Sequence, residues 1–427
     1  MHLDSPAPPL APVAGRPGVV GRLRRLPLWQ PLAQRDFRLV WTGEAISVLG
    51  DQFYLVALPW LVLQLTGSPF AVGTTLMTAA IPRAGLMLLG GAVTDRAAPR
   101  SILLLSNAAR AVLVAALGGL VWLGVAHTWH LYALVFLFGV ADAFSFPAFT
   151  AFVPRIVDRD RLAAANGLLQ GTAHLTMLVG PALAGVLIAA ASTVPAFEID
   201  AGSFVAAFAL LVLVRATGRG DGAGSVPTRG GLLRDIAEGL NYGWRDPATR
   251  AFLLMIAAVN LSFAGPFAVG LATLAARRFG GAVAYGTMMS AVGGGALAGS
   301  ILSGSIRTTA RQGLQLAAVI MLFGTGMAVV GLAPGLAVAS VLTGLLGVCA
   351  GFTNVRMVAW LQGRTPPMVL GRVMSLVMFA SLGLQPISYA LAGLLAGVHV
   401  TLLFLVAGGL IVITGAWGAA SRAVRTI

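Results

Sequence analysis

The chain has 427 residues, of which 58% are hydrophobic and only 10% are charged. Soluble domains carry about 45–50% apolar and about 25% charged residues, so this composition excludes an ordinary soluble protein. So few charges cannot cover a surface in water, and lipid must therefore solvate much of the chain. The single cysteine, Cys349, excludes a disulfide framework and a metal site built from cysteines.

The formal net charge of +14 comes from 28 basic residues, all of which are arginine. A nucleic-acid partner would need these arginines along one soluble face, but they cluster between apolar runs. Membrane topology accounts for such clusters, because cytoplasmic loops of membrane proteins are enriched in basic residues. The sequence therefore predicts a polytopic protein embedded in a lipid bilayer, without a nucleic-acid partner.

Twelve apolar runs reach the roughly 20 residues that a membrane-spanning helix needs. Residues 1–34 precede them and lack the apolar core of a signal peptide, so we expect a disordered cytoplasmic tail there. The predicted fold is an all-α membrane protein with twelve transmembrane helices in two six-helix bundles, 35–215 and 251–427, joined by a long loop at 216–250. In chain order the runs are 39–65, 70–93, 101–124, 131–153, 162–190, 197–214, 251–275, 284–305, 314–333, 335–360, 372–397 and 400–420.

The placement of arginine predicts the orientation. If the N-terminus is cytoplasmic, 23 of the 28 arginines lie in cytoplasmic segments, and only Arg277 and Arg278 lie on the opposite side. Such a bias follows the positive-inside rule. We therefore expect a protein of the cytoplasmic (inner) membrane, with both termini and the 216–250 loop in the cytoplasm.

The two halves of the chain look like distant copies of each other. Gly180-Pro181 followed by ALAG matches Gln385-Pro386 followed by ISYALAG, GVADAF matches GVCAGF, and a pair of loop arginines recurs. The spacings are 205, 208 and 211 residues (386 − 181, 347 − 139 and 307 − 96). Parallel six-helix repeats build one large class of transporters, whose substrate site lies at the repeat interface near the midplane.

The loop between the second and third runs reads GGAVTDRAAPR, residues 90–100. It resembles the loop signature Gly-x-x-x-Asp-Arg-x-Gly-Arg-Arg of the major facilitator superfamily, although Ala98 and Pro99 depart from it. Segments 35–60 and 154–170 are similar to the macrolide-efflux and enterobactin-exporter branch, and the resemblance covers 35–425. It implies a drug:proton antiporter, a small-molecule substrate and the two-bundle fold; we also expect a monomer. The matching loop positions are Gly91, Asp95, Arg96 and Arg100.

We interpret this loop as a conformational latch between the bundles. Asp95 lies at a helix end, where a carboxylate can accept charge-assisted hydrogen bonds from Arg96, Arg100 or a neighbouring helix terminus. Such bonds would hold one state and break when the bundles rock. The alternative is a solvated loop that only sets topology.

Several ionisable residues lie inside the predicted spans, where charge is expensive and often marks a transport pathway. Depth along the runs pairs Asp51 with Arg83 and Glu44 with Arg110, which leaves Asp142 as a surplus acid. A buried arginine stays charged and needs an anion nearby, whereas an unpartnered carboxylate can take up a proton. We therefore expect proton coupling through Asp51 or Asp142.

Other polar residues are candidates for the substrate cavity. His174 could titrate or bind ligand, or it could be hydrogen-bonded within the packed helices. Gly180 and Pro181 predict a bend in the fifth helix. The remaining cavity candidates, which could equally bond between helices, are Gln52, Asn260, Asn354, Gln385 and Tyr389.

The sequence contains no phosphate loop, no His/Cys metal cluster and no nucleophile constellation, so we expect neither a cofactor nor a metal nor an enzyme. The leading hypothesis is a secondary transporter that exports amphipathic organic molecules, such as drugs or siderophores. Two alternatives stay open at this point: an importer with the same fold, and a non-transporting membrane receptor or partner subunit.

Overall fold

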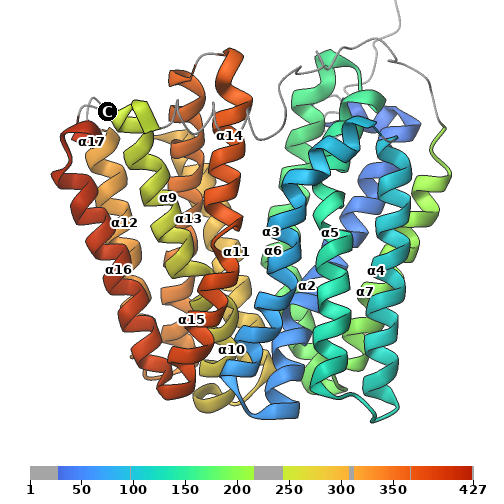
Figure 1. The fold of residues 1–427 in the computed structure, drawn as a ribbon, viewed down its shortest axis with the longest axis horizontal. Coiled ribbons are helices and arrows are strands. Elements are labelled where there is room, and N and C mark those ends of the chain that lie inside the picture. Colours follow the sequence, from blue (N-terminus) through green and yellow to red (C-terminus); the bar gives the residue numbers. More distant parts are fainter. Residues whose placement is uncertain (1–26, 97, 216–243, 307–311, 366, 426–427) are drawn as a thin grey trace, which may run out of the picture.

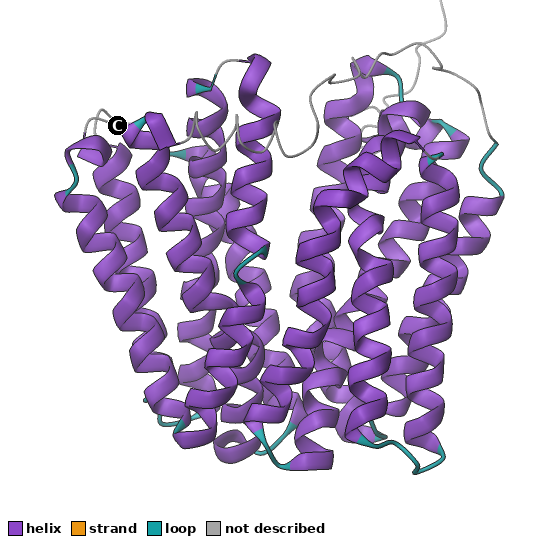
Figure 2. Ribbon diagram, in the orientation of Figure 1, coloured by secondary structure: helices purple, strands orange, loops and turns teal. Residues whose placement is uncertain are grey.

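The computed structural model describes residues 27–96, 98–215, 244–306, 312–365 and 367–425. Every element of secondary structure among these residues is helical (Figure 2). Ten helical segments of the described chain are long and apolar enough to cross a membrane. Two more, Pro69–Arg96 and Ala282–Ser305, have 28 and 24 residues and so also have the necessary length. The chain is a multi-pass, all-helical membrane protein, as predicted.

The first half of the chain forms one bundle (Figure 1). Its short first element, Pro27–Ala33, falls within the stretch predicted as tail but is a 3₁₀ helix packed against the fifth long helix. Most of the predicted tail, residues 1–26, lies outside the described residues. In chain order the elements are η1 (Pro27–Ala33), α2 (Arg35–Thr66), α3 (Pro69–Arg96), α4 (Pro99–Trp122), α5 (Thr128–Ile156), η2 (Arg159–Arg161), α6 (Leu162–Ala190) and α7 (Val194–Val212).

The second half forms the other bundle (Figure 1). Most of the predicted linker, residues 216–243, lies outside the described residues. In chain order the elements are α9 (Pro247–Gly265), η3 (Pro266–Gly270), α10 (Leu271–Leu274), η4 (Ala275–Phe279), α11 (Ala282–Ser305), α12 (Gln312–Val330), α13 (Leu336–Arg364), α14 (Pro367–Leu382), α15 (Gln385–Val398), α16 (Val400–Ala420) and α17 (Arg422–Arg425).

Two features of the helix boundaries follow directly from glycine and proline. Helix α2 stops where Gly67 adopts a left-handed conformation (φ 64°) and its N–H donates to the Leu63 carbonyl at 2.8 Å. The eleventh predicted run, by contrast, is divided into α14 and α15. Pro386 lies in the first turn of α15, where the N–H that proline lacks would have no helical partner.

The two bundles touch through two equivalent pairs of helices. Helix α6 packs against α11, and α15 packs against α3. These are the fifth and eighth, and the eleventh and second, predicted spans, so the repeat found in the sequence relates one contact to the other. The bundles meet near the end opposite the C-terminus and diverge towards the end that carries it (Figure 1).

Glycines allow the helix backbones at these contacts to approach closely. A Cβ atom added to Gly286 would lie 2.2 Å from the Pro181 carbonyl oxygen, and one added to Gly73 would lie 2.4 Å from that of Tyr389. Across the first contact, the Ala182 N–H also donates to the Ser290 hydroxyl at 2.8 Å. Small residues of this kind are the usual means of helix association in bilayers, where the hydrophobic effect contributes little.

Replacing Gly286 by leucine should force α6 away from α11. The new side chain would enter space filled by the Pro181 carbonyl, and overpacking of this kind costs about 1–3 kcal/mol. We expect a lower midpoint of thermal unfolding in detergent. The matched control is Gly304→Leu on the same helix, because nothing lies within 4 Å of a Cβ added there. Equal losses in the two variants would contradict this account of the contact.

Candidate functional site

A polar cavity lies inside the first bundle, between α2, α3, α4, α5 and α7. It encloses about 160 Å³, less than the roughly 300–1,000 Å³ of sites that bury a drug-sized ligand. It is therefore large enough for water, protons or one charged group. Five ionisable side chains line it, together with polar and apolar neighbours: Glu44, Asp51, Arg83, Arg110 and Asp142, with Val40, Gly43, Ser47, Leu103, Asn107, Ser145, Phe146, Phe149, Ala207 and Leu211.

The carboxylate of Asp142 on α5 forms ion pairs with two arginines. Its Oδ2 lies 3.1 Å from Nε of Arg83 on α3, and its Oδ1 lies 3.5 Å from NH1 of Arg110 on α4. The Asp142 side chain is 20% exposed and that of Arg110 only 9%, whereas that of Arg83 is 46% exposed. One carboxylate thus neutralises part of the charge of two guanidinium groups in a largely dehydrated place.

These pairs correct the pairing predicted from depth alone, which joined Asp51 to Arg83 and Glu44 to Arg110. That prediction matched residues by their depth in the membrane, and for Asp51 and Arg83 it also relied on their helices being consecutive in the chain. The structure instead packs α5 against both α3 and α4, while α2 packs mainly against α6 and α7. Asp142 is therefore between the two arginines, and the two acids of α2 are not.

Arg110 is held by two further interactions, with Asn107 and Phe204. Its NH2 donates to Oδ1 of Asn107, one turn earlier in α4, at 2.7 Å. Its guanidinium lies over the ring of Phe204 on α7, with 4.3 Å to the ring centroid, which adds a cation–π attraction. Its Nε is buried without a hydrogen-bond partner. The arrangement fixes the guanidinium in one place rather than leaving it to move with a ligand.

Glu44 and Asp51 line the same cavity from α2 but have no such partners. Among the described residues, neither side chain has a hydrogen bond or an ion pair within 4.0 Å. Arg110 acts on both only through longer-range electrostatic attraction. With three acids and two arginines in its lining, the cavity carries a surplus of negative charge when all are ionised.

Sequence reasoning missed Asp200 on α7, a buried acid of this bundle in addition to Glu44, Asp51 and Asp142. Its side chain is 0% exposed, and both carboxylate oxygens are buried without a hydrogen-bond partner. It was overlooked because it lies near the start of the short sixth run, where an acid can reach the headgroups. Helical periodicity could have found it: Asp200 shares the buried face of α7 with Phe197, Ser203 and Ala207.

The predicted bend residues of α6 lie where three helices meet. A Cβ atom added to Gly180 would lie 2.5 Å from the Cβ of Gln52, so this glycine allows α6 to contact α2. The Pro181 carbonyl faces Gly286 of α11, as described above. Gln52 is buried and donates to the Val48 carbonyl of its own helix at 3.4 Å. His174 lies half-buried earlier on α6 and does not line the cavity.

The cavity candidates of the second bundle do not gather with these acids. Asn260 donates to the Ile256 carbonyl of its own helix at 2.9 Å, and Asn354 is exposed on α13. Gln385 begins α15. Tyr389 of α15 is the exception, because it lies within electrostatic reach of Arg83 across the α3–α15 contact.

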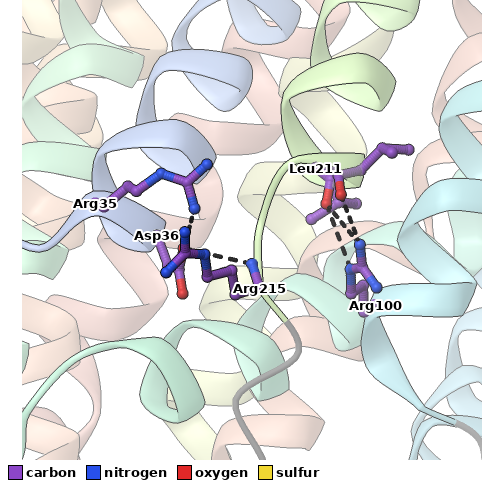
Figure 3. Close-up of polar contacts among 6 residues, drawn as sticks. Arg35, Asp36, Arg100, Leu211 and Arg215 are labelled. Atoms are coloured by element: carbon purple, nitrogen blue, oxygen red, sulfur yellow. Dashed lines mark hydrogen bonds and ion pairs between the residues drawn. The ribbon is translucent and has the colours of Figure 1, made fainter.

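Of the predicted latch residues, only Arg100 has a described side chain; those of Gly91, Asp95 and Arg96 lie outside the described residues. Arg100 donates to the carbonyl oxygens of Leu211 (3.3 Å) and Val212 (2.9 Å) (Figure 3). These are carbonyls of the last turn of α7, where the regular helical bonds end; the Leu211 carbonyl also accepts from the Val214 N–H at 3.3 Å. Arg100 therefore ties α4 to α7 within one bundle. Nearby, the Asp36 carboxylate accepts from the backbone N–H of Arg215 at 3.4 Å (Figure 3).

The last acid of the chain, Asp246, has a structural role at the start of α9. It accepts from the N–H of Thr249 at 3.0 Å and lies 3.1 Å from NH2 of Arg364 on α13. The Arg364 hydrogen bonds, more than the partial burial that opposes them, lower the pKa of Asp246 to about 2. Asp246 therefore stays ionised at neutral pH. Within the described residues, no group of three His, Cys, Asp or Glu side chains could hold a metal ion.

Comparisons with known proteins agree with this architecture. Residues 27–425 match the family described as transmembrane secretion effector. The multidrug efflux pump Tap of Mycolicibacterium fortuitum is 28% identical, over 83% of this chain and 88% of its own. Macrolide efflux protein A of Streptococcus pyogenes is 23% identical, over 88% and 93%. Among solved structures, a bacterial homologue of the human lysosomal transporter Spinster, inward-facing and occupied, superposes with a TM-score of 0.70 at 12% identity, over 93% and 98%.

Replacing Asp142 by asparagine should destabilise the first bundle. It leaves the Arg110 guanidinium buried without a carboxylate, and breaking a buried pair in this way costs about 3–5 kcal/mol. We expect a clear fall in the midpoint of thermal unfolding, and partial recovery in the double variant Asp142→Asn/Arg110→Gln. Arg83→Gln serves as the comparison, because its exposed guanidinium should matter less. An unchanged midpoint in Asp142→Asn would contradict the pairing.

Proposed function

Because the chain belongs to the transmembrane secretion effector family of the major facilitator superfamily, we propose that it exports amphipathic organic molecules in exchange for protons, by alternating access. The superfamily, the fold and the similarity to efflux pumps are findings. The coupling ion, the class of substrate and the transport cycle are what we propose. The names of the relatives favour export over import, and they favour transport over a receptor or partner subunit.

One observation carries the coupling part of this proposal. The cavity holds two carboxyl groups on α2, Glu44 and Asp51, that have no ion-pair partner among the described residues, next to a third, Asp142, that has two. A carboxylate locked between arginines has little tendency to take up a proton, whereas one without a cation nearby can exchange protons with water. Asp51 is therefore a better candidate for the coupling residue than Asp142.

The charge of the cavity suggests how protons and substrate compete. When Glu44, Asp51 and Asp142 are all ionised, two arginines leave one negative charge uncompensated. Either a proton or the cationic group of a substrate can neutralise it, but binding of one weakens binding of the other. That mutual exclusion is what an exchanger needs, because substrate bound from one side releases the proton there. The bulk of a drug-sized molecule would lie between the bundles, since the cavity itself is too small.

The contacts between the bundles support the alternating-access part. The bundles are joined through α6–α11 and α3–α15 near the end opposite the C-terminus and diverge at the other end. With the termini in the cytoplasm, as the arginine bias predicts, this is the inward-facing arrangement of a transporter in the cytoplasmic membrane. Rocking about the middle of these glycine contacts would open the opposite end.

The orientation can be tested with reporter fusions. A reporter attached after Ser192 should lie outside the cell and one attached after Gly222 inside, because five and six spans precede these points. An alkaline phosphatase fusion should therefore be active only at the first site, and a fluorescent protein that folds only in the cytoplasm only at the second. The same sidedness at both sites would overturn the topology.

The coupling residue can be tested in proteoliposomes with an imposed pH gradient. Wild-type protein should accumulate a cationic drug, or a macrolide, inside the liposomes against its gradient when the liposome interior is more acidic than the medium, because protons that leave the interior drive substrate inwards. Asp51→Asn should abolish accumulation, because a neutral amide cannot exchange a proton, while exchange of labelled for unlabelled substrate continues. Glu198→Gln, at an exposed acid of α7, is the control. Full pH-driven accumulation by Asp51→Asn would rule out this residue as the coupling group.

A further inference from the structure

One acid that the proposed cycle does not use, Asp200, is fully buried. Asp200 lies about one and a half turns into α7, within the membrane-spanning part of that helix, and none of its surface is exposed. It does not line the cavity that contains Glu44 and Asp51. Neither of its carboxylate oxygens has a hydrogen-bond partner in the part of the chain that the structure describes. An ionised carboxylate in such a place would lack both water and a counterion.

The space for this carboxyl group is provided by Gly50 of α2, the residue immediately before Asp51. A Cβ atom added to Gly50 would lie 2.9 Å from Oδ1 of Asp200 and 2.1 Å from Oγ of Ser203. Oδ1 of Asp200 and Oγ of Ser203 therefore both lie against the α2 backbone at Gly50. A larger residue at position 50 would displace the acid, so the two helices enclose it by close packing.

The bonding of Ser203 restricts which form of the acid the pocket can accept. The Ser203 hydroxyl donates its proton to the main-chain carbonyl of Asp200 at 2.7 Å. Towards the carboxyl group it can then offer only a lone pair. A lone pair attracts the O–H of a protonated carboxyl group and repels the oxygens of an ionised one.

The other ionisable groups facing Asp200 do not neutralise its charge. Helix α2 presents Asp51 and Tyr54, and the buried Tyr54 hydroxyl also lacks a partner. Helix α4 presents Arg110, which is committed to Asp142 of α5 and to Asn107. Asp51 is an acid and opposes a second negative charge beside it. Asp51 and the lone pair of Ser203 thus both favour a neutral carboxylic acid at Asp200, and only Arg110, which is engaged by Asp142, attracts the ionised form.

We infer that Asp200 is a second proton-binding residue of the transport cycle, neutral in the conformation seen here and able to pass its proton to Asp51. The role of Asp200 in transport rests on the proposed function, whereas the protonation of Asp200 in this conformation does not depend on it. In the transfer, the carboxyl O–H of Asp200 breaks and the proton joins an oxygen of the ionised Asp51 carboxylate. Water admitted in the opposite conformation then returns a proton to Asp200. Two acids that share protons in this way titrate as a pair.

Infrared spectroscopy of the purified full chain in lipid tests the protonation directly. The carbonyl stretch of protonated carboxyl groups should be present at neutral pH in the wild type and reduced in Asp200→Asn. It should be unchanged in Glu198→Gln, an exposed acid two residues away on the same helix. Ser203→Ala should shift the band rather than remove it, because it deletes only the acceptor. Equal bands in wild type and Asp200→Asn would overturn the inference.

The stability of the same variant gives a second, independent outcome. Asparagine resembles protonated aspartic acid in shape and charge, so Asp200→Asn should fold like the wild type. Failure of this variant to fold would mean that the ionised form is needed, and would also overturn the inference.

Transport rates separate this inference from the proposed function. The proton that Asp200 releases is the one that Asp51 receives, so Asp200→Asn removes the donor of that proton. In proteoliposomes the rate of pH-driven substrate accumulation should therefore fall severalfold in Asp200→Asn, while in Glu198→Gln it should not change. If the wild type moves substrate without protons, the proposed coupling fails, although the infrared band can still identify Asp200 as a neutral acid. If coupling is intact and the rate does not change in Asp200→Asn, Asp200 has no part in it.

Discussion

The interaction on which the first bundle depends is the double ion pair of Asp142. Arg83, Asp142 and Arg110 come from three different helices, so this one carboxylate joins α3, α5 and α4 across the interior of the bundle. Guanidinium groups do not lose their charge at any accessible pH, and inside a bilayer they therefore need an anion or main-chain carbonyls beside them. The pairing decides which acids are left over. Because both arginines turn towards Asp142, the carboxyl groups on α2 are without a cation of their own.

That distribution divides the acids of the bundle into three environments. Asp142 is paired, Glu44 and Asp51 face a polar cavity, and Asp200 is enclosed between α2 and α7 without cavity or partner. The environments differ in access to water rather than in depth. A single conformational change that alters the contact between α2 and α7 would therefore act on Asp51 and Asp200 together, because Gly50 and Asp51 are adjacent in the chain.

Much of the fold could be predicted from the sequence, and the site could be predicted only in part. The twelve runs correspond to the helices, and the match between Pro181 and Pro386 anticipated that α6 and α15 occupy equivalent positions at the bundle contacts. Lipid makes such predictions reliable, since each span must be long, apolar and helical.

The cavity residues Glu44, Asp51, Arg83, Arg110 and Asp142 were also identified, because charge inside a span is conspicuous. Their pairing was not, since depth along a helix carries no information about which helices are neighbours. Asp200 was missed for a related reason: a position near the end of a short run can face either headgroups or the core, and only packing against α2 decides.

The second bundle stabilises its charged side chains in a different way, so the two halves have different roles in proton binding. No acid follows Asp246 in the sequence. Two described arginines of this bundle bond instead to main-chain carbonyls and a hydroxyl: Arg278 to Gly331 at 2.8 Å and to Thr401, and Arg356 to Ser303 at 3.2 Å and to Ile306. Carbonyl oxygens at helix ends attract cations but do not titrate. The second bundle therefore contains no carboxyl group that could take up a proton within its spans. If protons bias the equilibrium between conformations, the bias must arise in the first bundle and reach the second through the α6–α11 and α3–α15 contacts. At Gly286 and Gly73 those contacts bring one backbone directly against the other, so a small shift of one helix there moves its neighbour.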